Sequence, residues 1–205
     1  LARILMPEQY GIVAIVTIFI NLANVFVTSG LGTSLVQKKE ADELDFSTMF
    51  WASIIFSLMI YIIIFIVSPL IAKIYNNELL TVVLRVMGLK IPLAAINSIQ
   101  QAYVQREMIF KKFFLSTIIG TIISAFVGIW MALNNFGVWS LVGQYLTNSI
   151  IDTFVLAITV KWRPHVIFSI ERFKKLFSYG WKIMASSFIG TVFDQFRGLI
   201  IGAKY

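Results

Sequence analysis

The sequence predicts an all-α integral membrane protein, a polytopic bundle of transmembrane helices. Hydrophobic residues make up 59% of the chain and charged residues only 13%, whereas ordinary soluble domains are about 45–50% apolar. The mean hydropathy is +0.85. The apolar runs reach about 20 residues or more, the length that a helix needs to cross a hydrocarbon core. Strands of a membrane barrel would be shorter and would alternate in polarity.

Six apolar segments are long enough to be membrane-spanning helices. They cover about residues 10–36, 48–72, 79–105, 113–133, 138–160 and 180–205. Pro7 and Glu8 stand where the first helix would begin, and Tyr10 follows as an interfacial aromatic residue. The second segment is apolar on nearly all sides, which favours a lipid-facing helix.

The connections between these spans alternate in charge, and the alternation predicts the orientation. One end of the bundle holds nearly all the basic residues: Lys38, Lys39, Arg106, Lys111, Lys112, Lys161, Arg163, Arg172, Lys174 and Lys175. The opposite connections hold only Arg3 and Lys73. Because lysine and arginine are retained on the cytoplasmic side, we expect the basic end to face the cytoplasm. The first residue is Leu1 and the chain stops within an apolar run, so we expect a fragment of a longer protein.

Metal and cofactor sites are not expected. The sequence has no cysteine and a single histidine, His165, so it lacks thiolate ligands and a second imidazole to share a metal ion. The outer side offers only Arg3, Glu8, Lys73 and Glu78 as ionisable groups, too few for the acid–base chemistry of a membrane glycan polymerase or acyltransferase. We therefore expect no catalytic residue and no enzymatic role.

The longest polar interruption is segment 161–179, KWRPHVIFSIERFKKLFSY. Ser169 is suited to cap a helix. Helical spacing then produces two faces. The apolar face carries Ile170, Phe173, Leu176 and Phe177, and the charged face carries Glu171, Arg172, Lys174 and Lys175. This pattern is typical of a helix lying in a membrane interface. We expect a cytoplasmic amphipathic segment between two membrane lobes.

Small residues recur at every fourth position of the span at 113–133, at Ser116, Gly120, Ser124 and Gly128. Such a ridge lets a neighbouring helix approach closely. It is compatible with a moving interface, although ridges of this kind usually provide static packing.

Polar residues line up along one face of four spans, which predicts a hydrophilic cavity at membrane depth because lipid would not tolerate them. The aligned residues follow the helical period: Thr17, Asn21, Asn24 and Thr28; Lys90, Asn97 and Gln101; Gln144, Asn148 and Asp152; Ser187, Thr191 and Asp194. Hydroxyls, amides and isolated cations suit a polyhydroxylated, anionic solute. A narrow ion pore would show rings of charge or a dedicated filter sequence.

Several charges fall inside the predicted spans. Lys90 lies roughly 16 Å from the outer end of its span, close to the middle of the bilayer. A charge at that depth costs several kcal/mol, so Lys90 should face a watery cavity or pair with Asp152 or Asp194. Arg85 is shallower and can extend to the outer interface. Asp194 and Arg197 are three residues apart and can pair on one helix.

Seven stretches carry a family resemblance: ILMPEQYGIVAIVTIF, SGLGTSLVQKKE, FWASIIFSL, VLRVMGLKIPL, QREMIFKK, NNFGVWSLVGQ and KWRPHVIFSIERFKKLFSYGWKIMASS. In this combination and order, the chain resembles polysaccharide biosynthesis proteins of the oligosaccharide flippase type. These belong to the multidrug/oligosaccharidyl-lipid/polysaccharide exporter superfamily. The resemblance covers essentially the whole chain.

The resemblance implies two six-helix lobes around a central cavity. Residues 1–160 would form the N-terminal lobe without its first helix, 161–179 the inter-lobe linker, and 180–205 the truncated first helix of the C-terminal lobe. The implied function is to flip an undecaprenyl-diphosphate-linked oligosaccharide across the bacterial cytoplasmic membrane by alternating access. The product would be capsule, exopolysaccharide or lipopolysaccharide. The implied partners are membrane lipids, the lipid-linked substrate and polysaccharide assembly proteins, with no nucleic acid.

Cavity cations would hold the substrate diphosphate in such a flippase. The candidate cavity residues are Lys90, Asn97, Gln101, Asn21, Asn24, Gln144, Asn148 and Arg197, and the candidates for ion coupling are Asp152 and Asp194. At position 197 the family would place an acidic or amide residue, so Arg197 departs from the pattern. A drug or small-solute exporter of the same superfamily is the alternative, with a more apolar cavity and a coupling carboxylate. A purely structural scaffold would not keep four polar stripes in the bilayer.

Overall fold

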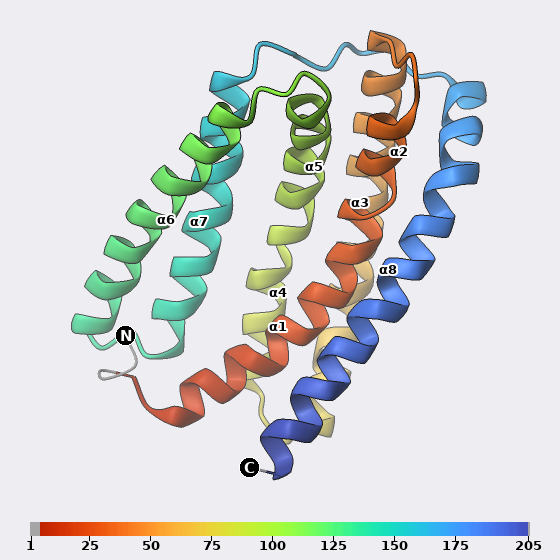
Figure 1. Ribbon diagram of the computed structural model, residues 1–205. Helices are drawn as coiled ribbons and strands as arrows, with labels where there is room; N and C mark the ends of the chain where they lie inside the picture. The colour runs from red at the N-terminus through yellow and green to blue at the C-terminus, as the bar shows by residue number, and fades with distance from the viewer. Residues whose placement is uncertain (1–4, 205) are drawn as a thin grey trace.

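The computed structural model describes the backbone of residues 5–204 and the side chains of residues 5–195, and the regular elements there are all helices. They are α1 (Pro7–Thr28), α2 (Leu31–Gln37), α3 (Glu43–Ile74), α4 (Leu79–Gly88), α5 (Lys90–Arg106), α6 (Phe110–Leu133), α7 (Val138–Thr159) and α8 (Ile170–Lys204). Figure 1 shows the helices side by side in one bundle, with residues 161–169 crossing one end from α7 to α8.

Five helical segments are long and apolar enough to cross a membrane, which confirms the predicted fold class. They are Pro7–Gln37, Glu43–Ile74, Leu79–Arg106, Phe110–Leu133 and Val138–Thr159. Large apolar side chains are exposed along the outer faces of α3 and α6, for example Ile66 and Phe126, as expected for helices that face lipid. The sixth expected span, 180–205, lies within α8, and its side chains are described only as far as Gln195.

The expected interfacial helix and the last expected span form one continuous helix. α8 begins at Ile170 and runs past Gly180 to Lys204, so only residues 161–169 of the linker are non-helical. Gly180 is instead a point of close contact with Gly30, which lies between α1 and α2. A Cβ atom on Gly30 would lie 2.7 Å from the Gly180 carbonyl oxygen. The two glycines therefore let the backbones of α8 and the α1–α2 junction touch.

The third span is interrupted at Leu89, between α4 and α5. Pro92 explains the break, because proline has no N–H to donate to the carbonyl of Gly88, four residues earlier. The interruption places Lys90 at the first position of α5. Leu89 itself keeps helical dihedral angles (φ −59°, ψ −18°), so α4 and α5 together form one membrane span, Leu79–Arg106.

Arg85 binds α3 instead of extending to the outer interface. Pro69 lies inside α3, and its missing N–H leaves the carbonyl of Phe65 without its helical donor. The Arg85 Nε donates to this carbonyl oxygen at 3.4 Å and to the Ser68 hydroxyl at 3.0 Å, and the guanidinium carbon lies 4.0 Å from the centre of the Phe65 ring. The Ser68 hydroxyl also donates to the Phe65 carbonyl oxygen, at 2.9 Å, so Ser68 and Arg85 together replace the N–H that Pro69 lacks.

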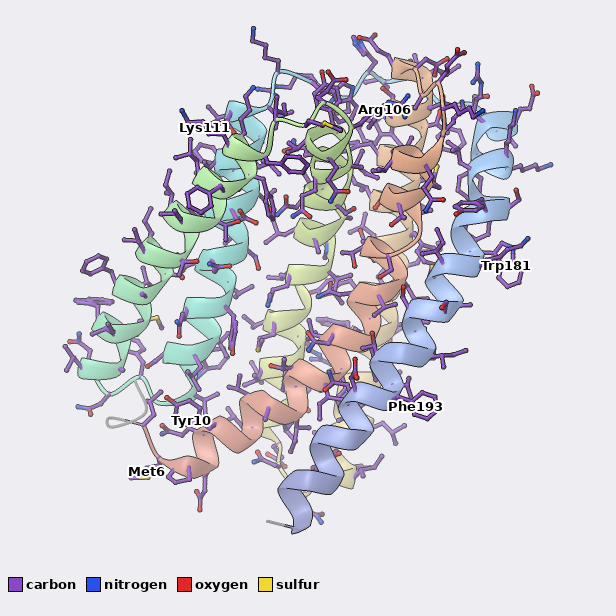
Figure 2. The ribbon with its side chains drawn as sticks, in the orientation of Figure 1. Met6, Tyr10, Arg106, Lys111, Trp181 and Phe193 are labelled. Carbon is purple, nitrogen blue, oxygen red and sulfur yellow. The ribbon has the colours of Figure 1, made fainter. Side chains whose placement is uncertain are left out.

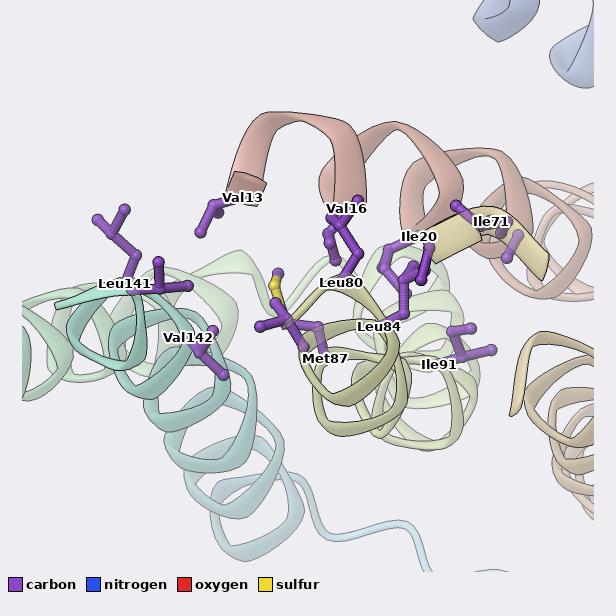
Figure 3. Packing of buried hydrophobic residues seen from close by; sticks show 14 of the residues in the cluster. Val13, Val16, Ile20, Ile71, Leu80, Leu84, Met87, Ile91, Leu141 and Val142 are labelled. Atoms are coloured by element: carbon purple, nitrogen blue, oxygen red, sulfur yellow. The ribbon is translucent and has the colours of Figure 1, made fainter. Parts of the chain in front are cut away.

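Two apolar clusters build the interior, one toward each end of the bundle. The first joins α1, α4 and the start of α7, through residues such as Val16, Leu84 and Val142 (Figure 3). The second joins α2, the start of α3 and the ends of α5 and α7, and includes Trp162 and Leu176. Between the two clusters, α5 and α7 carry the polar residues Asn97, Gln144, Asn148 and Asp152 among apolar ones.

The basic end is closed by the linker, which lies across the start of α3. The Ser47 hydroxyl accepts from the backbone N–H of His165 at 3.1 Å, and the Thr48 hydroxyl accepts from that of Ser169 at 3.2 Å. The Trp51 Nε1 donates to the His165 carbonyl oxygen at 2.8 Å. Figure 2 places Arg106 and Lys111 at this end and Met6 and Tyr10 at the opposite end.

A buried ion cluster ties α8 to α3 at the same end. Asp45 is fully buried, and its carboxylate meets the Lys38 ammonium and, at 3.4 Å, the Arg172 guanidinium. Arg172 also lies 3.3 Å from Asp42, the N-cap of α3. Asp42 and Asp45 accept each other's backbone N–H groups. The bond from the Asp45 N–H is the main cause that holds the pKa of Asp42 below its usual range.

Candidate functional site

The polar residues of α5 and α7 meet in a layer between the two apolar clusters. Asn97 Nδ2 donates to Asp152 Oδ2 at 2.7 Å, and Gln101 Nε2 donates to Asn97 Oδ1 at 3.3 Å. Asn97 is buried, whereas Gln101 and Asp152 are half-buried. The structure thus joins three of the predicted site residues in one hydrogen-bonded chain.

Five buried side-chain oxygen atoms lack a hydrogen-bond partner among the described residues. They are Asn24 Oδ1 on α1, Ser53 Oγ on α3, Gln100 Oε1 on α5, and Ser140 Oγ and Asp152 Oδ1 on α7. Buried polar atoms are normally paired, so acceptors of this kind favour water or ligand hydroxyl groups within the layer. Sequence reasoning did not select Ser53, because a lone serine in an apolar helix carries no distinctive signal.

The polar face of α7 packs on the small-residue ridge of α6. A Cβ atom on Gly128 would lie 3.0 Å from the Gln144 Cβ, and one on Gly120 would lie 3.3 Å from the Asn148 carbonyl oxygen. Asn148 Nδ2 also reaches the Ser124 hydroxyl at 3.5 Å. Gln144 and Asn148 are therefore held between two helices and are only half-exposed. The static-packing interpretation of the ridge accounts for these contacts.

Lys90 lies beside an open groove between α1 and α7. Its Nζ is 4.9 Å from the centre of the Tyr145 ring, and Tyr145 lines a groove of about 460 Å³ together with Tyr10, Val13, Ala14, Thr17, Ile18, Leu141 and Gln195. Among the described side chains, Lys90 forms no ion pair with Asp152. A cation held by a ring face in this position can attract an anionic group that enters the groove.

The remaining predicted site residues are spread over α1 and α8. Asn21 and Asn24 are half-buried on α1 and form no hydrogen bond with the Asn97–Asp152 chain among the described residues. Asp194 is exposed on α8. The side chain of Arg197 lies outside the described residues, so its expected pairing with Asp194 does too. No group of three histidine, aspartate or glutamate side chains that could hold a metal ion occurs in the described part of the chain.

Comparisons with known proteins place these features in context. The profile of a family described as "Polysaccharide biosynthesis protein" matches residues 1–205. Succinoglycan biosynthesis transport protein ExoT of Rhizobium meliloti (strain 1021) is 26% identical over 201 residues, which are 98% of this chain and 41% of that protein. Lipopolysaccharide biosynthesis protein WzxC of Escherichia coli (strain K12) is 24% identical over 209 residues, with coverages of 98% and 41%.

A third relative is Teichuronic acid biosynthesis protein TuaB of Bacillus subtilis (strain 168), which is 23% identical over 182 residues, 88% of this chain and 38% of that protein. The chain therefore spans about two fifths of the length of these relatives. No solved structure matches the chain significantly.

Proposed function

The chain belongs to the polysaccharide biosynthesis protein family, and from that premise we propose that it is part of a transporter for a lipid-linked glycan. The transporter would flip an undecaprenyl-diphosphate-linked oligosaccharide from the cytoplasmic to the outer leaflet of the bacterial cytoplasmic membrane by alternating access. The glycan would serve the synthesis of capsule, exopolysaccharide or lipopolysaccharide.

The position of Lys90 is the observation that carries this proposal. It begins α5 at an interrupted helix in a membrane span, next to a groove with hydroxyl and amide groups, Thr17 and Gln195. A solitary intramembrane cation is a functional feature by default. The diphosphate of the substrate would be the anionic partner of the Lys90 ammonium. The sugar hydroxyls would form hydrogen bonds with the amides and hydroxyls of the polar layer. Asp152 is the proposed site of ion coupling, because its Oδ1 is buried without a partner.

Lys90→Ala in the full-length protein is expected to abolish the return of surface polysaccharide to a strain that lacks the transporter. The reason is that none of the described residues that line the groove is a cation, whereas Lys90 lies against Tyr145 at its edge. Surface glycan is measured with a glycan-specific antibody or stain, and protein levels by immunoblot. Lys73→Ala is the matched control, since Lys73 is an exposed lysine near the end of α3. Normal surface glycan with Lys90→Ala at normal protein levels would remove Lys90 from the site.

The proposed orientation places the basic end in the cytoplasm, with residues 1–160 in one lobe and 161–179 as the link to the next. Single cysteines at Ser169 and Asn135, which lie at opposite ends of the bundle, are expected to react with a membrane-impermeant maleimide from opposite sides. The chain has no native cysteine to interfere. Labelling of both positions from the same side would contradict the proposed topology.

A further inference from the structure

The basic end contains a pocket between α2 and the first turns of α8. The close contact between Gly30 and Gly180 holds the α1–α2 junction against α8 beside this pocket. A Cβ atom on Gly180 would lie 2.8 Å from the Gly30 carbonyl oxygen. Beyond this contact, toward the basic end, the two helices enclose about 230 Å³ lined by Ser34, Gln37, Lys38, Lys175, Leu176 and Tyr179.

The lining supplies hydrogen-bond donors over an apolar wall. The Lys38 ammonium bonds to Asp45, which leaves two of its three N–H groups free to act elsewhere. The Tyr179 hydroxyl lies against the Gln37 amide oxygen, so the amide nitrogen of Gln37 keeps both its donors. Lys175 is exposed and pairs with no carboxylate among the described residues. Leu176, only 5% exposed, forms the apolar side.

The carboxylates that pair with Lys38 and Arg172 beside the pocket do not pair with Lys175. Asp42 and Asp45 are already shared between Lys38 and Arg172. The Arg106 guanidinium binds the carbonyl oxygens of Leu35, Lys38 and Lys39 at the end of α2 and uses no carboxylate. An anion in the pocket would therefore meet unmatched cations.

The depth of the pocket fits the headgroup region of a membrane. It lies at the same end of the bundle as Arg106 and Lys111 (Figure 2) and next to Trp181, which points away from α8 and is 49% exposed. Exposed tryptophan and tyrosine side chains are typical of the membrane interface. The volume is below the range of about 300–1,000 Å³ of pockets that enclose whole small molecules, so a headgroup suits it better than an entire ligand.

We propose that the pocket between α2 and α8 binds the phosphate group of an anionic phospholipid from the surrounding leaflet. Lys38, Lys175 and the Gln37 amide would donate to the phosphate oxygens, and Leu176 with the Tyr179 ring would contact the glycerol and the upper acyl chain. Such a lipid would bridge α2 and α8 where Arg172 already joins α8 to α3. The site is distinct from the Lys90 groove, because the two share no lining residue.

Native mass spectrometry of the full-length protein, equilibrated with equal amounts of phosphatidylglycerol and phosphatidylcholine, tests the site. The wild-type protein is expected to retain phosphatidylglycerol preferentially. Lys175→Gln is expected to weaken that retention about fivefold, the contribution of one lysine near an anionic lipid surface. Lys111→Gln, which removes an exposed lysine from the start of α6 at the same end, is expected to leave retention unchanged.

Three results would overturn the assignment. The first is equal loss of phosphatidylglycerol in the Lys175→Gln and Lys111→Gln proteins, and the second is equal retention of the two lipids by the wild type. The third is displacement of phosphatidylglycerol by undecaprenyl diphosphate through Lys175, which would make the pocket a substrate site. Native mass spectrometry measures lipid binding and does not require transport. Its outcome is therefore independent of the result with Lys90→Ala, which measures surface polysaccharide.

Discussion

Asp45→Ala is expected to lower the free energy of unfolding by about 3–5 kcal/mol, the usual loss when one partner of a buried ion pair is removed. Asp45 is fully buried, and without its carboxylate Lys38 and Arg172 lose their common partner. The change also removes the carboxylate that accepts the Asp42 N–H at the start of α3. Equilibrium unfolding of the full-length protein in mixed micelles with increasing dodecyl sulfate measures the loss.

Glu43→Ala is the control for this experiment. Glu43 lies two residues earlier in the same helical turn, and its carboxylate is 74% exposed at 3.6 Å from His165. Exposed pairs contribute about 0–1 kcal/mol, so this substitution should barely change stability. Equal destabilisation by the two substitutions would show that the Asp45 cluster contributes no more than a surface contact.

If Asp152 has the proposed coupling role, Asp152→Asn is expected to abolish the response of transport to an imposed pH gradient while the fold is kept. Asparagine offers an oxygen for the bond from Asn97 Nδ2 but lacks the carboxylate. Asp152 pairs with no cation among the described residues, and its Oδ1 has no hydrogen-bond partner there. Uptake of a labelled lipid-linked glycan into inverted vesicles, with and without an imposed pH gradient, measures the effect.

The other candidate carboxylate provides the comparison. Asp194 is exposed on α8 and belongs to no hydrogen-bonded chain in the described structure, so Asp194→Asn is expected to retain the gradient response. Retained gradient dependence with Asp152→Asn and its loss with Asp194→Asn would transfer the coupling role to Asp194.

The sequence predicted the features that depend on spacing within one helix. Five apolar spans followed from length and hydropathy alone. The ridge that includes Gly120 and Gly128 followed from a four-residue repeat. The polar faces that carry Asn97 and Asp152 followed from the helical period, and the structure joins these two side chains by a hydrogen bond.

Features that depend on partners distant along the chain could not be predicted in this way. Arg172 and Asp45 are 127 residues apart, and on sequence alone each is an ordinary charge in a polar connection. Gly180 resembled a boundary between elements because it follows an aromatic residue at the start of an apolar run. The role of Gly180 became evident only from its close contact with Gly30. This contact is possible because neither residue has a side chain.

The contact between Arg85 and the backbone beside Pro69 bears on how the protein enters the membrane. An arginine costs about 2.5–3.5 kcal/mol at the centre of an inserting helix, and a carbonyl without a donor costs several kcal/mol in lipid. The Ser68 hydroxyl already donates to the Phe65 carbonyl oxygen within α3. The cost that depends on both helices is therefore that of Arg85, whose guanidinium finds its acceptors on α3. The free-energy cost of inserting α3 and α4 into the bilayer is consequently lower when they insert together, as a hairpin, than one after the other.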